Sequence, residues 1–327
     1  MRPTIRDVAR QAGVSIATVS RVMRAPENVS PATRDRVTDA IDELQYTPSH
    51  LGRQLAERRH AANGIVFPDL AGPYYAEVVL GYESVAAELG RSVLILSTHN
   101  RDAAPSMVEE MAGRCDGLVI LGRTVPDDVI ERLHRRRTPL VLLARQPIGD
   151  VDSVCAENTP SAERLAEHVL AHGARRLVFV GDPVRSPDMS ERWAGISSAV
   201  EAVAEARVTL RRTAGFGVED GAEVAREAIA AGDLPDAFLC ANDELALGLL
   251  ADLKSAGVAV PDEVMVTGWD DVMAARYAGL TTVRQPMREL GASAARLLDE
   301  QITGSRTEPR HELLPTELVV RASTGKP

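Results

Sequence analysis

The chain has 327 residues, 45% of them hydrophobic, which is enough for two or three domains with large cores. It carries no apolar run of eighteen residues and no apolar stretch at its start, so we expect neither a membrane span nor a secretory signal. The net charge is −10. The three scattered cysteines fit neither a disulfide framework nor a metal site, so we expect them to be small buried side chains in a reducing cytoplasm.

Charge is unevenly distributed along the chain. Residues 1–60 hold ten arginines and seven acidic residues, a net charge of +3, whereas the remainder holds 27 basic and 40 acidic residues. A basic head on an acidic body is typical of a DNA-binding module joined to a domain that does not touch DNA.

The head begins with a predicted helix. Thr4 and Asp7 have the spacing of a capping box, and apolar residues then recur at helical spacing until Gly13. A glycine at this point allows a tight turn that a side chain would strain. The pattern therefore predicts a short helix that ends in a turn.

Two more helices are predicted after this turn. Ser15 can cap a helix over residues 16–23, and Ser30 followed by Pro31 can start a third helix that runs to about Leu44. A short helix, a glycine turn and a second short helix predict a helix-turn-helix, with the third helix closing its core.

The outward face of the second helix predicts DNA contacts. Arg21 can reach guanine acceptors in the major groove, and Ile16 and Ala17 can press on thymine methyl groups, while short hydroxyls suit phosphates or base edges. In this head we predict DNA contacts from Thr4, Ser15, Ile16, Ala17, Thr18, Ser20 and Arg21.

The run 4–22, together with 29–37, 40–44 and 46–48, resembles the DNA-binding head of the lactose/galactose-repressor family over more than forty positions. The resemblance implies a DNA-binding domain at 1–46 followed by a hinge helix and linker at 47–61. In that hinge, Leu55 would match the family's leucine that wedges into the minor groove.

Three residues depart from the family pattern. Ser49 and Arg24 each replace the usual Asn, and Gly52 replaces the usual Ala. Gly52 should cost roughly 1 kcal/mol of helix propensity. We include Ser49, Leu55 and Arg24 among the predicted DNA contacts, with Arg24 as an added phosphate contact.

The body, residues 62–327, alternates short apolar strands with amphipathic helices. Strands are predicted at 65–67, 93–96, 118–121 and 140–143, and a second set at 177–180, 237–240 and 264–267. Helices are predicted at 77–89, 161–172, 191–203, 218–231 and 244–256. The fold class is therefore an all-α head plus an α/β body of two doubly wound parallel-sheet lobes, with a cleft at the carboxyl ends of the strands.

The resemblance extends over the body, at 68–70, 240–248, 268–271, 280–286 and 315–321, and implies an effector-binding domain similar to periplasmic sugar-binding proteins. It implies polar effector contacts from Asp69, Arg192, Asn242 and Asp270, and aromatic ones from Tyr74, Tyr75 and Phe216. Carboxylate, amide, guanidinium and an aromatic face together suit a sugar. Glu157 and Asn158 also end a predicted strand and can line the cleft.

Three other functions compete with this interpretation. A sugar-modifying enzyme is disfavoured because the sequence lacks a dinucleotide fingerprint, a P-loop, a nucleophile elbow and a His-Glu-x-x-His motif. A free solute-binding protein is disfavoured by the head. A purine- or nucleoside-responsive regulator remains open beside the carbohydrate-responsive one.

We therefore expect a cytoplasmic, homodimeric, sequence-specific transcriptional regulator, a repressor, whose grip on a palindromic double-stranded operator is controlled by a small carbohydrate. Two half-sites related by two-fold symmetry predict an operator of about 14–20 base pairs. No cofactor, metal or membrane is expected. The interface of the dimer should come from the lobes near the head.

Overall fold

The computed structural model describes residues 3–46, 60–99 and 101–325, and its contacts divide the chain into a unit at 1–60 and a unit at 61–327. The predicted hinge residues Ser49, Gly52 and Leu55 lie outside the described residues, as does the side chain of Arg24. Within the described part, no helix is both long and apolar enough to cross a bilayer.

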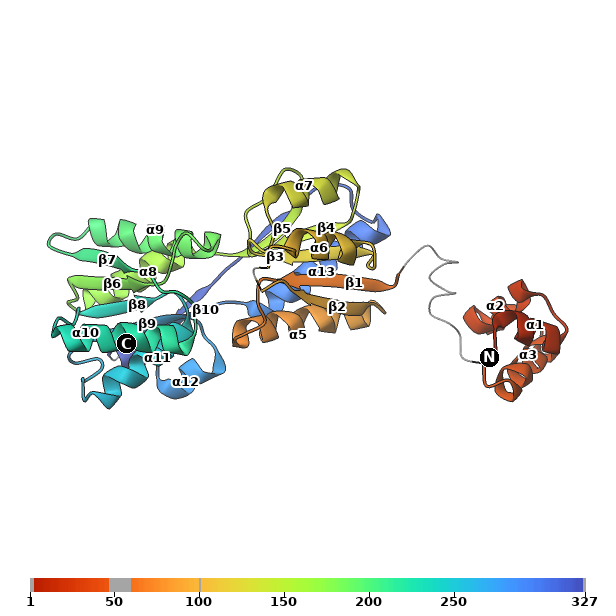
Figure 1. Ribbon diagram of the computed structural model, residues 1–327, viewed down its shortest axis with the longest axis horizontal. Helices are drawn as coiled ribbons and strands as arrows, with labels where there is room; N and C mark the ends of the chain where they lie inside the picture. The colour runs from red at the N-terminus through yellow and green to blue at the C-terminus, as the bar shows by residue number, and fades with distance from the viewer. Residues whose placement is uncertain (1–2, 47–59, 100, 326–327) are drawn as a thin grey trace. The chain divides into compact units, whose positions relative to one another are not determined.

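The first unit is a helix-turn-helix, as the sequence predicted (Figure 1). Its helices are α1 (Ile5–Ala12), α2 (Ile16–Arg24) and α3 (Pro31–Glu43), with a single 3-10 turn η1 (Pro26–Asn28). Gly13 ends α1 with a φ of 62°, a left-handed conformation that glycine adopts without strain.

A small core holds these three helices together. Its buried residues are Val8, Ala9, Ala12, Val19, Val22, Val37 and Ala40. The alanines let α1 approach its neighbours closely, and Val19 fills the space between α1 and α2. The residues on the outer face of α2 are therefore not part of this core.

The first lobe of the body is a six-stranded, all-parallel sheet in the order β11-β5-β4-β3-β1-β2. Its strands are β1 (Ala62–Phe67), β2 (Ser92–Ser97), β3 (Gly117–Leu121), β4 (Leu140–Leu143), β5 (Asp152–Ala156) and β11 (His311–Leu314). Helices α5 (Pro73–Glu88) and α13 (Met287–Thr303) cover one face, and α6 (Ala104–Ala112) and α7 (Asp127–Arg135) cover the other (Figure 1).

The second lobe is a six-stranded sheet in the order β12-β10-β9-β8-β6-β7, parallel except for β12. Its strands are β6 (Arg176–Val180), β7 (Arg207–Arg211), β8 (Ala237–Cys240), β9 (Met265–Asp270), β10 (Thr281–Arg284) and β12 (Glu317–Val319). The surrounding helices are α8 (Thr159–Ala171), α9 (Pro187–Glu201), α10 (Val218–Ala231), α11 (Asp243–Ser255), α12 (Met273–Ala278) and η2 (Ala322–Thr324).

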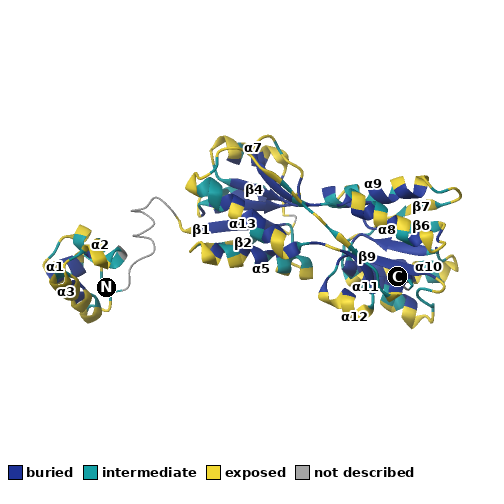
Figure 2. Cartoon of the chain, turned by 180° about the vertical axis from the view of Figure 1, so that it is seen from behind, coloured by how far each residue is buried: buried dark blue, intermediate teal, exposed yellow. Residues whose placement is uncertain are grey.

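Both lobes are buried at the sheet and exposed on the outer faces of their helices (Figure 2). All seven predicted strands are present, and the five predicted helices occur within a few residues of their expected bounds. The sequence missed β5, β7, β10, β11 and β12 because they are short and lack a continuous apolar run. The outer strand β7, for example, alternates exposed and half-buried residues.

The chain crosses between the lobes three times, from β5 to α8, from β10 to α13 and from β11 to β12. The carboxyl ends of the two sheets face each other, since Arg123 Nη1, which follows β3, donates to the carbonyl of Val184, which follows β6, at 3.3 Å. This facing arrangement is where ligands bind in open parallel sheets.

The three cysteines are free thiols. Cys115 and Cys240 are buried as expected, but Cys155 is only half-buried. The expectation was wrong there because Cys155 lies near the carboxyl end of β5, at the edge of the sheet that faces the other lobe. Its thiol donates to the carbonyl oxygen of Arg145 at 3.2 Å.

Candidate functional site

The predicted DNA-reading residues lie on one exposed side of α2. Ser15 caps the helix by accepting the backbone N–H of Thr18 at 3.1 Å, and its hydroxyl also lies 2.9 Å from that of Thr18. Ile16 is 45% exposed, although a large apolar side chain would normally be buried. Arg21 is exposed as well. An apolar and a cationic side chain on one free helix face suit base edges in a major groove.

The other predicted contacts differ in how free they are. Ala17 is exposed, and Thr18 and Ser20 are half-buried. Thr4 is exposed, but its backbone N–H and its hydroxyl both donate to the Asp7 carboxylate, at 2.9 and 2.7 Å. These hydrogen bonds lower the pKa of Asp7 below its usual range.

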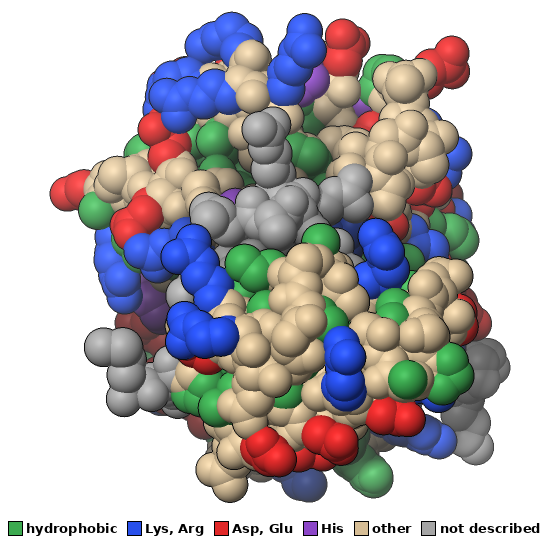
Figure 3. All heavy atoms as spheres, turned by 90° about the vertical axis from the view of Figure 1, so that its right-hand side faces the viewer, with side chains coloured by type: hydrophobic (Ala, Val, Ile, Leu, Met, Phe, Trp, Pro, Cys, Tyr) green, Lys and Arg blue, Asp and Glu red, His purple; other side chains and the backbone are tan. Residues whose placement is uncertain are grey.

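Figure 3, which draws atoms of both units, shows Lys and Arg side chains as well as Asp and Glu side chains on its face. The small positive charge of the head supplies only a modest non-specific attraction to DNA. Specific contacts from α2 have to supply the rest.

In the body, the predicted effector residues meet at the facing ends of the two sheets, and Arg192 lies at their centre. This side chain is only 4% exposed. Its Nε donates to Asn158 Oδ1 at 2.9 Å and its Nη1 to the Ala241 carbonyl at 2.6 Å. The guanidinium also lies over the Trp269 ring, 4.4 Å from its centroid. Nη2 has no hydrogen-bond partner among the described residues, which leaves it free for a ligand oxygen.

Asp270, at the end of β9, is held in an unusual backbone conformation. Its φ is 115°, in the left-handed half of the map that favours glycine, and Asp271 follows with a φ of 58°. Such conformations cost on the order of 1–3 kcal/mol and occur preferentially at functional sites. The carboxylate is 6% exposed, and its Oδ1 accepts from Gln285 Nε2 at 2.6 Å. Its other oxygen has no hydrogen-bond partner in the described part of the chain.

Tyr74 and Tyr75 form an aromatic wall from the first turn of α5. Their rings lie edge to face with centroids 5.4 Å apart, and Tyr75 packs similarly on Phe67 at 5.7 Å. Burial raises the pKa of Tyr75 to about 12 and raises that of Tyr74 well above its usual value. Both phenols are therefore neutral donors at physiological pH.

Asn242 and Phe216 are tied to each other. Asn242 caps α11, because its Oδ1 accepts the Leu245 N–H at 3.0 Å, and its Nδ2 donates to the carbonyl of Phe216 at 2.9 Å. The Phe216 ring is half-buried, and the Arg185 guanidinium lies 5.7 Å from its centroid. Asn242 thus has a structural role, with one amide hydrogen left over.

Asp69 makes mostly local contacts. Its Oδ1 accepts from the backbone N–H groups of Leu70 and Ala71 at 2.6 and 3.2 Å, and it lies 3.5 Å from His99 Nδ1. Its charge still reaches the Tyr75 hydroxyl and contributes to the raised pKa of that group. Asp69 therefore lies at the rim of the group around Tyr75.

The structure adds residues that sequence reasoning left unassigned. Asp188, in the first turn of α9, accepts from Asn158 Nδ2 at 3.2 Å, and Glu191 accepts from the same nitrogen at 3.1 Å. Glu244 borders Gly72, where an added Cβ would overlap its carboxylate. Gln285 follows β10 and binds Asp270. Gln285 lies in the stretch 280–286 that resembles the family, but the sequence analysis gave it no role.

Burial raises the pKa values of carboxyl groups in this cluster. It raises the pKa of Asp188 to about 6 and that of Asp270 to about 7, against the opposing effect of the Arg192 cation on both. Asp243, which accepts from the Thr282 hydroxyl and the Val272 N–H, also has its pKa raised by burial, with the nearby Asp270 charge adding to the shift.

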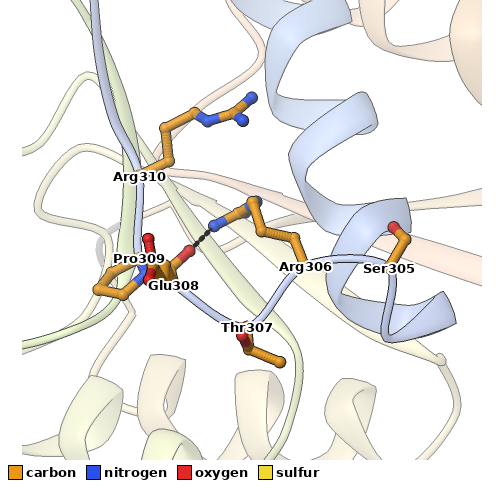
Figure 4. A pocket seen from close by; sticks show the side chains of 6 residues that line it. All are labelled: Ser305, Arg306, Thr307, Glu308, Pro309 and Arg310. Atoms are coloured by element: carbon orange, nitrogen blue, oxygen red, sulfur yellow. Dashed lines mark hydrogen bonds between the residues drawn. The ribbon is translucent and has the colours of Figure 1, made fainter.

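The body has two surface hollows, and one of them borders this region. One of about 430 Å³ includes Asp270, Gln285 and the start of α13 in its lining. The other, of about 410 Å³, is lined by the loop 305–310 (Figure 4), where Arg306 reaches the Glu308 carbonyl and Asp152. Asp152 begins β5, so this second hollow lies at the amino end of the sheet, away from the edge where ligands bind. We assign no function to it.

Comparison with known proteins agrees with both units. A family model described as bacterial regulatory proteins of the lacI family matches residues 4–49, and one described as a periplasmic binding protein-like domain matches residues 166–324. The chain is 31% identical to the HTH-type transcriptional repressor PurR of Photobacterium profundum over 98% of each chain.

Solved structures show the same architecture. A Lac repressor dimer bound to operator and the anti-inducer ONPF superposes with a TM-score of 0.87, 27% identity and full coverage of both chains. A complex of the transcriptional regulator CelR with cellobiose gives a TM-score of 0.72 and 31% identity over 98% of this chain and all of the other. These relatives are transcription regulators and not enzymes. The chain therefore belongs to the LacI family of bacterial transcriptional regulators.

Proposed function

We propose that this regulator is a repressor that acts in the cytoplasm as a homodimer, reads a palindromic operator with α2, and responds to a small carbohydrate bound between its lobes. The observation that carries the carbohydrate assignment is the group around Arg192. A buried cation with a free nitrogen, a buried carboxylate at Asp270 and the aromatic wall of Tyr74 and Tyr75 suit hydroxyls and the apolar face of a pyranose.

The relatives support the same assignment. The CelR structure holds cellobiose, and the Lac repressor structure holds the anti-inducer ONPF. Buried polar groups that lack partners favour a ligand that satisfies them, because an unmade hydrogen bond costs more than a made one gains. Hydroxyl groups can both donate to Asp270 and accept from Arg192.

A purine or nucleoside is the second candidate effector, favoured by the 31% identity to PurR. The aromatic wall of Tyr74 and Tyr75 could stack on a base as well as on a sugar. Tight purine binding by the purified protein, without any sugar binding, would replace the carbohydrate assignment.

A second copy of the chain is the proposed partner. The edge strand β2 carries two exposed apolar residues, Leu94 and Ile95, which are 40% and 48% exposed. Leu80 on α5 is exposed as well. Helix α12 carries Met273 and Tyr277, which are 76% and 83% exposed. Figures 1 and 2 both draw α5 and α12 along the same side of the body. Exposed apolar residues that share one side mark a protein interface, and two-fold pairing would present two heads to a palindrome.

The function is tested by selecting binding sites from random duplex DNA with the full-length protein, then repeating the selection with sugars and purines. We expect a palindrome of about 14–20 base pairs and its release by a carbohydrate. Enrichment of no sequence under any condition would contradict the operator assignment. Enrichment that a sugar strengthens would make the sugar a corepressor instead of an inducer.

A further inference from the structure

The cleft of this regulator is acidic. The carboxylates of Asp69, Asp188, Glu244 and Asp270 all act electrostatically on the hydroxyl of Tyr75, although they come from four separate segments. Glu191 joins them through Asn158, which it shares with Asp188. Arg192 is the cation whose charge reaches Asp188 and Asp270.

Few ion pairs compensate the negative charge of these carboxylates. Among the ion pairs of the described residues, Asp69 pairs only with His99, and none involves Asp188, Glu244 or Asp270. The side chains that donate hydrogen bonds to Asp188 and Asp270 are the neutral amides of Asn158 and Gln285, and Arg192 acts on both carboxylates only through its charge. A negatively charged ligand would add repulsion here, whereas a ligand with a positive charge would supply the missing partner.

Polar groups without hydrogen-bond partners among the described residues lie at the same place. Arg192 is 4% exposed and its Nη2 lacks a partner within the described residues. The indole N–H of Trp269, under that guanidinium, is buried without a partner as well. Asp270 is kept in a backbone conformation unfavourable for a side chain. The two tyrosine rings add aromatic faces, which attract an ammonium group as well as a sugar ring.

We propose that the effector is an amino sugar, whose ammonium group lies among the carboxylates of Asp188, Glu244 and Asp270 while Arg192 donates to one of its oxygens. This inference rests on the proposed carbohydrate function and narrows it. It excludes phosphorylated sugars and sugar acids, because their anions would meet four carboxylates.

Binding of such a cation should be linked to protons. With pKa values of about 6 and 7, Asp188 and Asp270 hold part of their protons near neutrality in the free protein. An ammonium group favours their ionised forms, so binding releases protons, and affinity rises as the pH increases from 6 to 7.5. The other titratable groups that interact with these two are Glu191, Asp243, Glu244, Arg192, Cys155 and the two tyrosines.

The experiment is calorimetric titration of the full-length protein with matched ligands. Glucosamine, galactosamine and mannosamine are compared with the parent hexoses, the N-acetyl derivatives and the 6-phosphates, in buffers of different ionisation enthalpy. We expect at least one amine to bind about tenfold or more tightly than its hexose, with proton release, and to lose this advantage on N-acetylation. Equal or tighter binding of the hexose or phosphate, or no binding by any amine, overturns the inference.

Variants separate the charge effect from folding. Asp188→Asn should reduce the ratio of amine to hexose affinity about tenfold, because it removes a charge and keeps the shape. Glu201→Gln, an exposed carboxylate farther along α9, should leave that ratio unchanged. An unchanged ratio in Asp188→Asn and also in Glu244→Gln would overturn the inference.

The outcomes also distinguish this inference from the proposed function. If neutral sugars bind and release the operator while amines do not, the carbohydrate regulator stands and only the amino-sugar assignment fails. If no sugar binds and a purine does, both fail.

Discussion

Arg21 and Ile16 are exposed on α2, and that exposure is unusual only for the isoleucine. Both side chains are presented by a helix whose start is fixed by Ser15 and whose inner face is fixed by Val19. A reading residue needs such support, because a misplaced bidentate donor loses most of its discrimination.

Replacement of Arg21 by Ala should weaken operator binding by roughly 1–3 kcal/mol and relax specificity at one base pair, because a bidentate contact to guanine is lost. The measurement is operator affinity at fixed salt, for the selected site and its single-base variants. Arg6→Ala, an exposed arginine of α1, serves as the control and should weaken binding equally for all sequences if it touches DNA at all. A uniform loss in Arg21→Ala would remove its role in base reading.

Asp270 couples stability to pH. Its folded-state pKa of about 7, against an ordinary value of 3.8, means that the folded chain holds this proton more tightly than the unfolded chain does. The free energy of unfolding therefore decreases as the pH rises from about 4 through 7. This cost disappears if the carboxylate cannot ionise.

We accordingly expect Asp270→Asn to raise the free energy of unfolding at pH 8 by about 1–3 kcal/mol and to leave it nearly unchanged at pH 4. Effector binding should weaken at the same time, since the amide is a poorer acceptor than the carboxylate. Denaturant titration of both proteins at the two pH values checks the first effect. A variant that is less stable at pH 8 would contradict the assigned burial cost.

At the scale of elements, glycines set how closely paired helices approach. A Cβ added at Gly248 of α11 would lie 1.8 Å from the Val218 carbonyl oxygen of α10, and one at Gly81 of α5 would overlap the Arg288 carbonyl of α13. The helices would have to separate and open the core beneath them.

Gly248→Ala should therefore destabilise the body by about 1–3 kcal/mol or more, despite the better helix propensity of alanine. Thermal unfolding measures the change. Gly113→Ala is the matched control, because its added Cβ would meet only the Glu110 carbonyl oxygen at 3.4 Å and its backbone is right-handed helical. Equal stability of the two variants would show that α10 and α11 can shift apart without cost.

The edge strand β2 is an element that the proposed dimer must cover. Unpaired sheet edges with apolar side chains are a liability unless another chain lies on them. Ile95→Asp should shift the protein from dimer to monomer in sedimentation and weaken operator binding at least about tenfold, because one head binds half a palindrome. Leu313→Asp, on the opposite edge strand β11, should change neither property. A dimer that survives Ile95→Asp would place the interface elsewhere.

At the scale of the whole molecule, operator binding and effector binding are assigned to separate units. A chain of residues 61–327 should bind the effector with unchanged affinity and should not bind the operator, since α2 is absent. Calorimetry and a duplex-binding assay on this fragment check both halves of the expectation. Specific DNA binding by the fragment would contradict the division of labour.

In the intact protein the two binding events should be linked reciprocally. If the effector lowers operator affinity by some factor, the operator must lower effector affinity by the same factor. Effector titration of the full-length protein with and without operator duplex measures this linkage.

The sequence alone determined the helix-turn-helix and the two parallel-sheet lobes. Capping residues such as Ser15, the turn glycine Gly13 and apolar runs such as 118–121 act over a few residues, so local structure follows directly from local sequence. Strands with a continuous apolar run were found even when they had four residues, as in β4 and β8, and strands that mix polar with apolar residues, such as β7 and β10, were not.

Only the tertiary structure decided the charge of the cleft. In the sequence, Asp188 and Glu244 are ordinary acidic residues in the first turns of helices, where they suit the helix dipole. Folding brings them beside Asp270 and Tyr75, which belong to other segments, and removes water around them. Electrostatic energy depends on distance and burial and not on sequence separation, so this property arises when the two sheets come to face each other.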